Sequence, residues 1–166
     1  MTRLKVGRLV PPGPETVTWP PDPWIWVPVG TPPRRVVVPG VPPSLNQILG
    51  LRPAPLSRIR RGWETVMALA VDRARATGIW DGRTWPPGTL FVRFAFPWRS
   101  RRTHDLDNLT PKWLIDGLRA QGVLADDSTR WVESLWLGTA RAEAVPFTVL
   151  EWGNPRQRPP RMRREA

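Results

Sequence analysis

Residues 89–98 read Thr-Leu-Phe-Val-Arg-Phe-Ala-Phe-Pro-Trp, a run rich in Phe and Val that predicts a β-strand. A helical pattern is found on each side of this strand. Apolar side chains recur at helical spacing in residues 57–77, where Gly78 is the expected stop, and again in residues 108–121, where Gly122 is the expected stop. The predicted strand therefore lies between two predicted helices.

Three further stretches predict strands. Residues 34–39 contain three consecutive valines, and residues 131–139 and 145–152 follow the second helix. We expect the last two to form a hairpin that turns near residues 140–144. The resulting order is β-α-β-α-β-β, which predicts a small α/β (α+β) domain with two helices and a mixed sheet of about four strands.

Both ends of the chain differ in composition from the middle. Of the 22 prolines, 14 lie within the first 55 residues, and residues 1–33 are interrupted by proline too often for a helix or a central strand. We expect an extended Pro/Trp-rich arm over 1–33 and a domain over 34–152. Arginine and proline dominate residues 153–166, which predicts a disordered basic tail.

The overall charge is strongly positive. The chain has 25 Lys and Arg against 14 Asp and Glu, a formal net charge of +11, which favours a polyanionic partner such as nucleic acid and disfavours an acidic partner-binding domain. The absence of cysteine excludes disulfides, a thiol nucleophile and cysteine-ligated metal sites. No stretch has the ~18 consecutive apolar residues of a membrane helix and no secretory signal is found, so we expect a cytoplasmic protein without membrane contact.

The few acidic residues are concentrated in one segment. Asp105 and Asp107 follow the strand of residues 89–98, and side chains two apart on a strand face the same side. Asp126 and Asp127 follow the second helix, which we expect to return them beside the first pair. Carboxylates converging at the ends of two neighbouring strands would suit Mg²⁺, whose remaining positions are filled by water and substrate phosphate.

Each of these features also has a purely structural interpretation. Asp107 or Asn108 is a good N-cap for a helix beginning at Leu109, and Asp126-Asp127 is compatible with an ordinary turn. Lys112 is one of only two lysines in a chain that otherwise uses arginine. Its ammonium group could hold a phosphate, or it could pair on the surface with Asp116, four residues further on.

The same residues resemble a known family. The run Asp105-Leu-Asp-Asn-Leu109, followed by Lys112, Asp116-Gly-Leu, Gly122-Val and Asp126-Asp127, is similar to the RusA-type Holliday junction resolvases, which are often found in phages and prophages. Pro42-Pro-Ser-Leu-Asn46 resembles the N-terminal Pro-Pro-Ser-x-Asn element of that family. The resemblance extends over roughly residues 34–152 and is most specific between residues 105 and 127.

The resemblance implies a homodimeric, Mg²⁺-dependent endodeoxyribonuclease, with Mn²⁺ as a substitute, acting in DNA recombination and repair. Such enzymes cut branched DNA, such as a four-way junction, with one nick per subunit. By motif, Asp105, Asp107 and Asp127 would be catalytic metal ligands and Asp126 their acidic neighbour. Lys112 would be the catalytic lysine, although it follows the asparagine by four residues where the family has three.

Arginines near the acidic segment are candidates for positioning the DNA backbone. Arg99, Arg101 and Arg102 lie just before Asp105, and His104 is expected to contact phosphate or to be exposed. A second group on the first helix, Arg58, Arg60 and Arg61, could contact phosphate or form a solvated helix face.

We expect hydrolysis to leave a 5′-phosphate and a 3′-hydroxyl.

Two other classes of function remain open. One is a catalytically inactive DNA-binding phage protein with the same fold, for which the shifted Lys112 would be the sign of lost activity. The other is a transferase that uses the Asp105-x-Asp107 pair, Mn²⁺ and a nucleotide-sugar. The transferase is disfavoured because the chain lacks a Gly-rich nucleotide-binding turn and has little room for a second substrate domain.

Overall fold

The computed structural model describes residues 34–97 and 105–153. The predicted arm of residues 1–33 lies outside this range, and so does the predicted tail except Gly153, which ends a strand. In chain order the elements are β1 (Arg35–Pro39), α1 (Leu45–Leu49), α2 (Pro53–Ala76), β2 (Gly88–Pro97), the 3₁₀ turn η3 (Leu106–Asn108), α3 (Lys112–Ala120), β3 (Val132–Ala142) and β4 (Phe147–Gly153).

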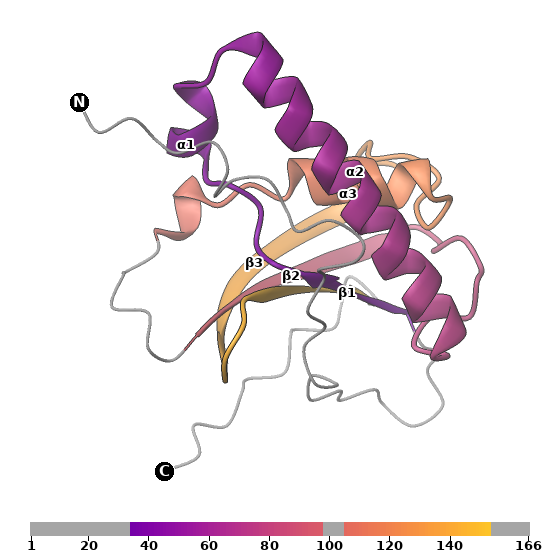
Figure 1. Cartoon of the computed structure of the whole chain (residues 1–166). Helices are drawn as coiled ribbons and strands as arrows, with labels where there is room; N and C mark the ends of the chain where they lie inside the picture. The colour runs from indigo at the N-terminus through magenta and orange to yellow at the C-terminus, as the bar shows by residue number, and fades with distance from the viewer. Residues whose placement is uncertain (1–33, 98–104, 154–166) are drawn as a thin grey trace.

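The four strands form one mixed sheet in the order β1-β4-β2-β3 (Figure 1). β4 pairs antiparallel with both β1 and β2, whereas β2 and β3 are parallel. The predicted class, a small mixed α/β fold with the strand and helix order β-α-β-α-β-β, is confirmed. Two short elements, α1 and η3, add to that order.

The predicted hairpin between the last two strands is wrong. β4 lies between β1 and β2, so β2 separates it from β3. The physical reason is visible in the burial of each strand: Thr148, Val149 and Leu150 are all buried, as expected for a central strand, whereas most of β3 is exposed or half-buried. A central position lets β4 bury both of its faces.

The long helices α2 and α3 cover the same face of the sheet (Figure 1). Alternate side chains of β2 point to that face, and Leu90, Val92 and Phe94 are almost fully buried there. α2 contributes Ile59, Trp63, Met67 and Ala70 to the same core, and α3 contributes Leu114 and Leu118. The core thus fixes α3 on the sheet. α3 carries Lys112 and lies between the two aspartate pairs, Asp105/Asp107 before it and Asp126/Asp127 after it.

The opposite face of the sheet holds an ion-pair group. Glu151 on β4 accepts hydrogen bonds from Arg35 on β1 and forms an ion pair with Arg93 on β2 at 3.1 Å. Arg35 is buried, and a buried guanidinium is costly unless a carboxylate compensates it. The three charges therefore join β1, β4 and β2 on the face away from the helices.

The helices differ from the predictions in two places: α1 is an additional helix, and α3 begins later than expected. α1 forms directly after Pro42-Pro43, where the sequence predicts a loop, and the Gln47 side chain accepts a hydrogen bond from the Ser44 backbone N–H at 2.8 Å, half of a capping box. α3 begins at Lys112 rather than at residue 108. Pro111 caps the helix, and Leu109 before it is extended, so the chain cannot be helical continuously from Asn108.

Candidate functional site

The Asp105-x-Asp107 pair is found at η3, not on a strand. Asp105 is the residue before the turn and Asp107 is inside it, and both are exposed. No hydrogen bond or ion pair joins either carboxylate to another residue within 34–97 or 105–153. Both carboxylates are therefore presented to solvent with their oxygen lone pairs uncommitted to any described group.

η3 is held in place by two contacts at its C-terminal end. The Asn108 side-chain carbonyl accepts a hydrogen bond at 3.0 Å from the backbone N–H of Asn46 on α1. Leu109, the next residue, is buried in the core beneath the helices. The contact brings together two sequence elements that lie 62 residues apart, Pro42–Asn46 and Asp105–Asn108. No pattern in the sequence indicates this contact, although both elements carry the family resemblance.

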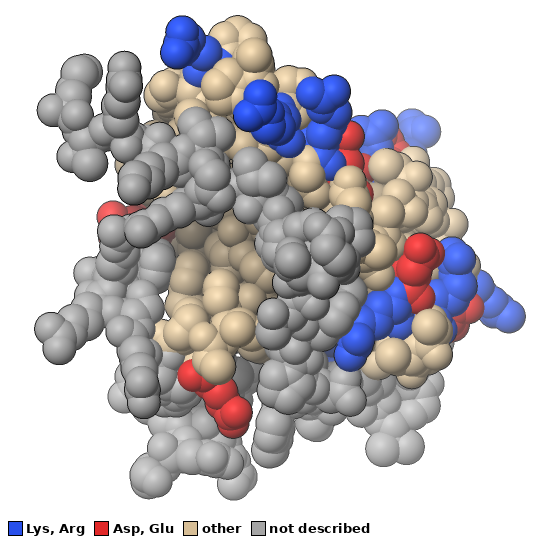
Figure 2. Space-filling view, in the orientation of Figure 1, with Lys and Arg blue, Asp and Glu red and all other residues tan. Residues whose placement is uncertain are grey.

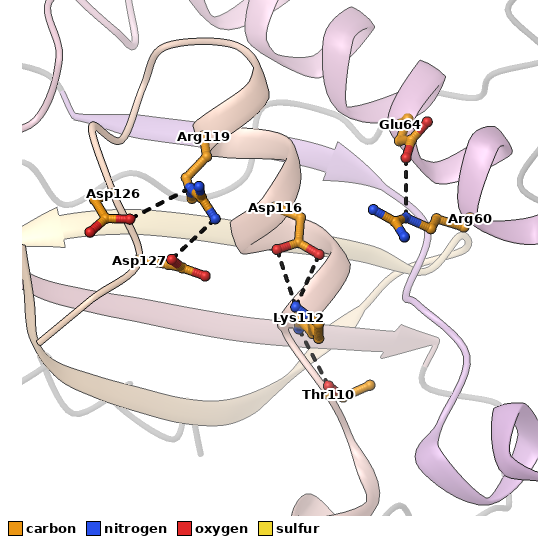
Figure 3. Close-up of polar contacts among 8 residues, drawn as sticks. All are labelled: Arg60, Glu64, Thr110, Lys112, Asp116, Arg119, Asp126 and Asp127. Carbon is orange, nitrogen blue, oxygen red and sulfur yellow. Dashed lines mark hydrogen bonds and ion pairs between the residues drawn. The ribbon is translucent and has the colours of Figure 1, made fainter. Parts of the chain in front are cut away.

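Lys112 forms an ion pair with Asp116 on the surface of α3, as its purely structural interpretation predicted. Its Nζ lies 3.3 Å from each carboxylate oxygen of Asp116, one turn further along α3 (Figure 3). The Lys112 side chain is 70% exposed and that of Asp116 26% exposed. An exposed pair four residues apart on a helix stabilises it by only about 0.3–0.5 kcal/mol, so the ammonium group can exchange Asp116 for another anion at little cost.

Asp126 and Asp127 are both paired with Arg119, near the end of α3 (Figure 3). The Arg119 guanidinium lies 3.1 Å from Asp127 Oδ1 and 3.9 Å from Asp126 Oδ1. Hydrogen bonds from the Ser128 side chain and the Asp127 backbone, followed by the charge of Arg119, lower the pKa of Asp126. No spacing pattern in the sequence indicated Arg119 as the partner of this pair.

Two glycines of the motif have structural roles in placing these residues. A Cβ at Gly117 would lie 2.5 Å from Met67 Cγ and 2.7 Å from Met67 Cβ, so glycine is what allows α3 to approach α2. Gly122 has a φ of +72°, the left-handed conformation that ends α3. The buried Val123 and Leu124 follow it and fix the path to Asp126.

The expected convergence of three carboxylates is not found. In the described part of the chain, no three or more Asp, Glu, His or Cys side chains are grouped so that they could hold a metal ion. Asp105 and Asp107 precede α3 and Asp127 follows it, with a helix of nine residues, about 13.5 Å long, between them. Because β2 and β3 are parallel, the start of β3 pairs with the start of β2, not with its end.

The residues present fit Mg²⁺ in part. The exposed carboxylates of Asp105 and Asp107 offer hard oxygen donors, and Mg²⁺ commonly uses one or two carboxylates and completes its shell with water and phosphate. Asp127 fits less well, because its carboxylate already accepts a hydrogen bond from Arg119. Asp105 and Asp107 are thus the stronger candidates for metal ligands. Asp127 would first have to give up its hydrogen bond with Arg119 before it could bind a metal ion.

The predicted phosphate-binding arginines are only partly within the described residues. Arg99, Arg101, Arg102 and His104 lie outside them. Arg58, Arg60 and Arg61 are exposed on α2, where Arg60 pairs with Glu64 at 3.2 Å (Figure 3). Figure 2 shows Lys and Arg side chains gathered at the top of the displayed face, where Figure 1 places the first turns of α2. This helix end is one basic region of the displayed face; a second group of Lys and Arg side chains lies at its lower right, mixed with Asp and Glu (Figure 2).

Among the helices within residues 34–97 and 105–153, none has the length and apolar character needed to cross a membrane. Comparison of the chain with models of protein families and with curated proteins found no match to either.

Proposed function

We propose that this chain is an Mg²⁺-dependent endodeoxyribonuclease that nicks branched DNA, as its motifs suggest through their similarity to RusA-type resolvases. The proposed substrate is a four-way junction or related branched DNA of recombination and repair, and the proposed location is the cytoplasm. The active form would be a homodimer that introduces one nick per subunit.

The observation that carries the proposal is the hydrogen bond between Asn108 and Asn46. It joins the Pro-Pro-Ser-x-Asn element to the Asp-x-Asp-Asn element, so the two motifs form one local surface. The exposure of Asp105 and Asp107 without a described partner supports a role in binding a cation.

Each residue has a distinct part in this proposal. Asp105 and Asp107 would hold Mg²⁺, which when bound supplies charge neutralisation at the phosphate and activation of a water molecule. Lys112, released from Asp116, would contact a phosphate oxygen and stabilise the negative charge that develops during hydrolysis. Arg58 and Arg61 would contact phosphates of a flanking arm and contribute affinity without sequence preference.

A second function is favoured by a specific observation. Lys112 is paired with Asp116, and Asp127 is paired with Arg119, so two of the four predicted catalytic groups are engaged with other residues. A protein that binds branched DNA without cutting it would tolerate both ion pairs permanently. In this alternative the basic residues still bind DNA, but no phosphodiester bond is hydrolysed.

The test is nicking of a synthetic four-way junction by the full chain in the presence of Mg²⁺ or Mn²⁺. Asp107→Asn should retain junction binding and lose cleavage by at least about 100-fold, because a metal ligand is removed while the shape is kept. Asp72→Asn is the matched control, since Asp72 is also exposed but lies on α2. Cleavage retained in Asp107→Asn would remove this residue from the mechanism, and tight binding without nicks by the unmodified chain would favour the inactive alternative.

A further inference from the structure

β3 forms an edge of the sheet and is its longest strand. It spans eleven residues, pairs with β2 on one side, and has no strand of the described residues on its other side. An unpaired strand edge presents a row of backbone N–H and C=O groups that can accept another strand. Natural edge strands are commonly short or strongly charged. β3 is long, and its central residues carry no charge.

The centre of β3 exposes two large apolar side chains. Leu135 is 43% exposed and Trp136 is 45% exposed. Consecutive side chains on a strand point to opposite faces, so this edge is apolar on both faces of the sheet. The ring of Trp136 lies 6.4 Å from that of Phe91 on β2, which leaves its outer side toward the free edge.

β3 is self-complementary when two copies run antiparallel about Leu137. In that register Trp136 of each copy lies opposite Gly138 of the other, and Leu135 lies opposite Thr139. A Cβ built at Gly138 meets no heavy atom within 4 Å, so the space above this residue is open. An aromatic ring placed over a glycine of a neighbouring strand fills such a space.

The charges at the two ends of β3 favour the same arrangement. Glu133 and Arg141 are both exposed, one near each end of the strand. Glu133 is the extra residue where the pairing of β2 with β3 shifts register, so the strand is regular from Ser134 onward. Antiparallel pairing of two copies places Glu133 near Arg141 twice, whereas parallel pairing would place like charges together.

We infer that β3 is a pairing site for a second copy of this chain, joined edge to edge in antiparallel about Leu137 to give one continuous sheet of eight described strands. The occupant is a second copy because the apolar centre and the terminal charges of β3 complement β3 itself. This inference rests on the homodimer of the proposed function and adds the surface that joins the two copies. A dimer that is insensitive to changes in β3 would overturn it while leaving the proposed nuclease activity untouched.

Charge exchange tests the pairing. The full chain should form a dimer in sedimentation velocity, and Glu133→Arg or Arg141→Glu alone should weaken it at least about tenfold, because each change creates two like-charged contacts. The double variant Glu133→Arg with Arg141→Glu should recover most of the affinity. Glu143→Arg, an equal charge change just beyond the strand, is the matched control and should leave the dimer unchanged.

Cysteine cross-linking tests the register, and the chain contains no cysteine of its own to interfere. The double variant Leu135→Cys, Thr139→Cys should form an inter-chain disulfide on mild oxidation, because directly opposite residues have Cβ atoms about 5 Å apart. Neither single variant should form this disulfide, because in the proposed register position 135 of one copy lies opposite position 139 of the other, about four residues away from position 135 of that copy. A monomeric full chain, a dimer that is insensitive to both charge reversals, or equal cross-linking of a single variant would each overturn the inference.

Discussion

Replacing Gly117 with alanine tests how closely α2 and α3 must approach. The added Cβ would lie 2.7 Å from Met67 Cβ and 2.5 Å from Met67 Cγ, well inside normal carbon–carbon contact of about 3.5–4.0 Å. The Cβ of Met67 is fixed to the backbone of α2, so changing the rotamer of Met67 cannot remove this clash. Relief requires the two helices to separate.

The expected magnitude follows from two opposing effects. Forcing an extra carbon into a packed core costs about 1–3 kcal/mol, and Met67 is fully buried. Alanine in a helix interior is favoured over glycine by about 0.8–1.0 kcal/mol. We therefore expect Gly117→Ala to lower the free energy of unfolding by up to about 2 kcal/mol, the difference between these terms.

Urea denaturation followed by tryptophan fluorescence measures this change. Gly50→Ala is the control, because a Cβ at Gly50 meets no heavy atom within 4 Å, and it should be neutral or slightly stabilising. In a Met67→Ala background the penalty should shrink without vanishing, because Cγ is gone but Cβ remains. Equal or greater stability of Gly117→Ala would refute the argument that glycine sets the distance between these helices.

Three further predictions concern the charged residues. Ser128→Ala should raise the pKa of Asp126 toward its usual value, as measured by NMR titration, because the Ser128 hydrogen bond is the largest cause that lowers it. Since the folded pKa of Asp126 is lowered, its contribution to stability is present above the unfolded pKa and is lost as pH falls through the folded pKa, so urea denaturation should show the two proteins converging in acid. Asp116→Asn should retain junction cleavage while Lys112→Met abolishes it, because only the lysine is proposed to contact phosphate. Arg58→Gln should reduce the salt dependence of junction binding by about one unit of slope, as expected for one lost phosphate contact.

The secondary structure was largely predictable because local patterns were strong. Every strand predicted within the described residues is present, since the Val- and Phe-rich runs have high β propensity and one buried face. The pairing of β4 was not predictable, because adjacency in sequence favours a hairpin and only the burial of both faces places β4 in the centre. The Ser44–Gln47 capping box was a usable signal for α1 that the proline-rich surroundings obscured.

The candidate site was predicted less well than the fold. Sequence placed Asp105 and Asp107 at the end of a strand, whereas they lie on a 3₁₀ turn held by Asn46. The predicted proximity of Asp127 overlooked that parallel strands begin at the same edge of a sheet. The position of Arg119 beside Asp127 depends on the left-handed turn after α3, a non-local geometry that no residue spacing reveals.

The central position of β4 also constrains when the protein can fold during its synthesis. Arg35 at the start of β1 pairs with Glu151 in β4, so the sheet joins residues 116 positions apart. Until β4 has left the ribosome, β1 and β2 have no strand between them, and the edges of both remain unpaired. Such non-local pairing slows folding and exposes a nascent chain to misassembly, so β4 should act as the last step that closes the sheet.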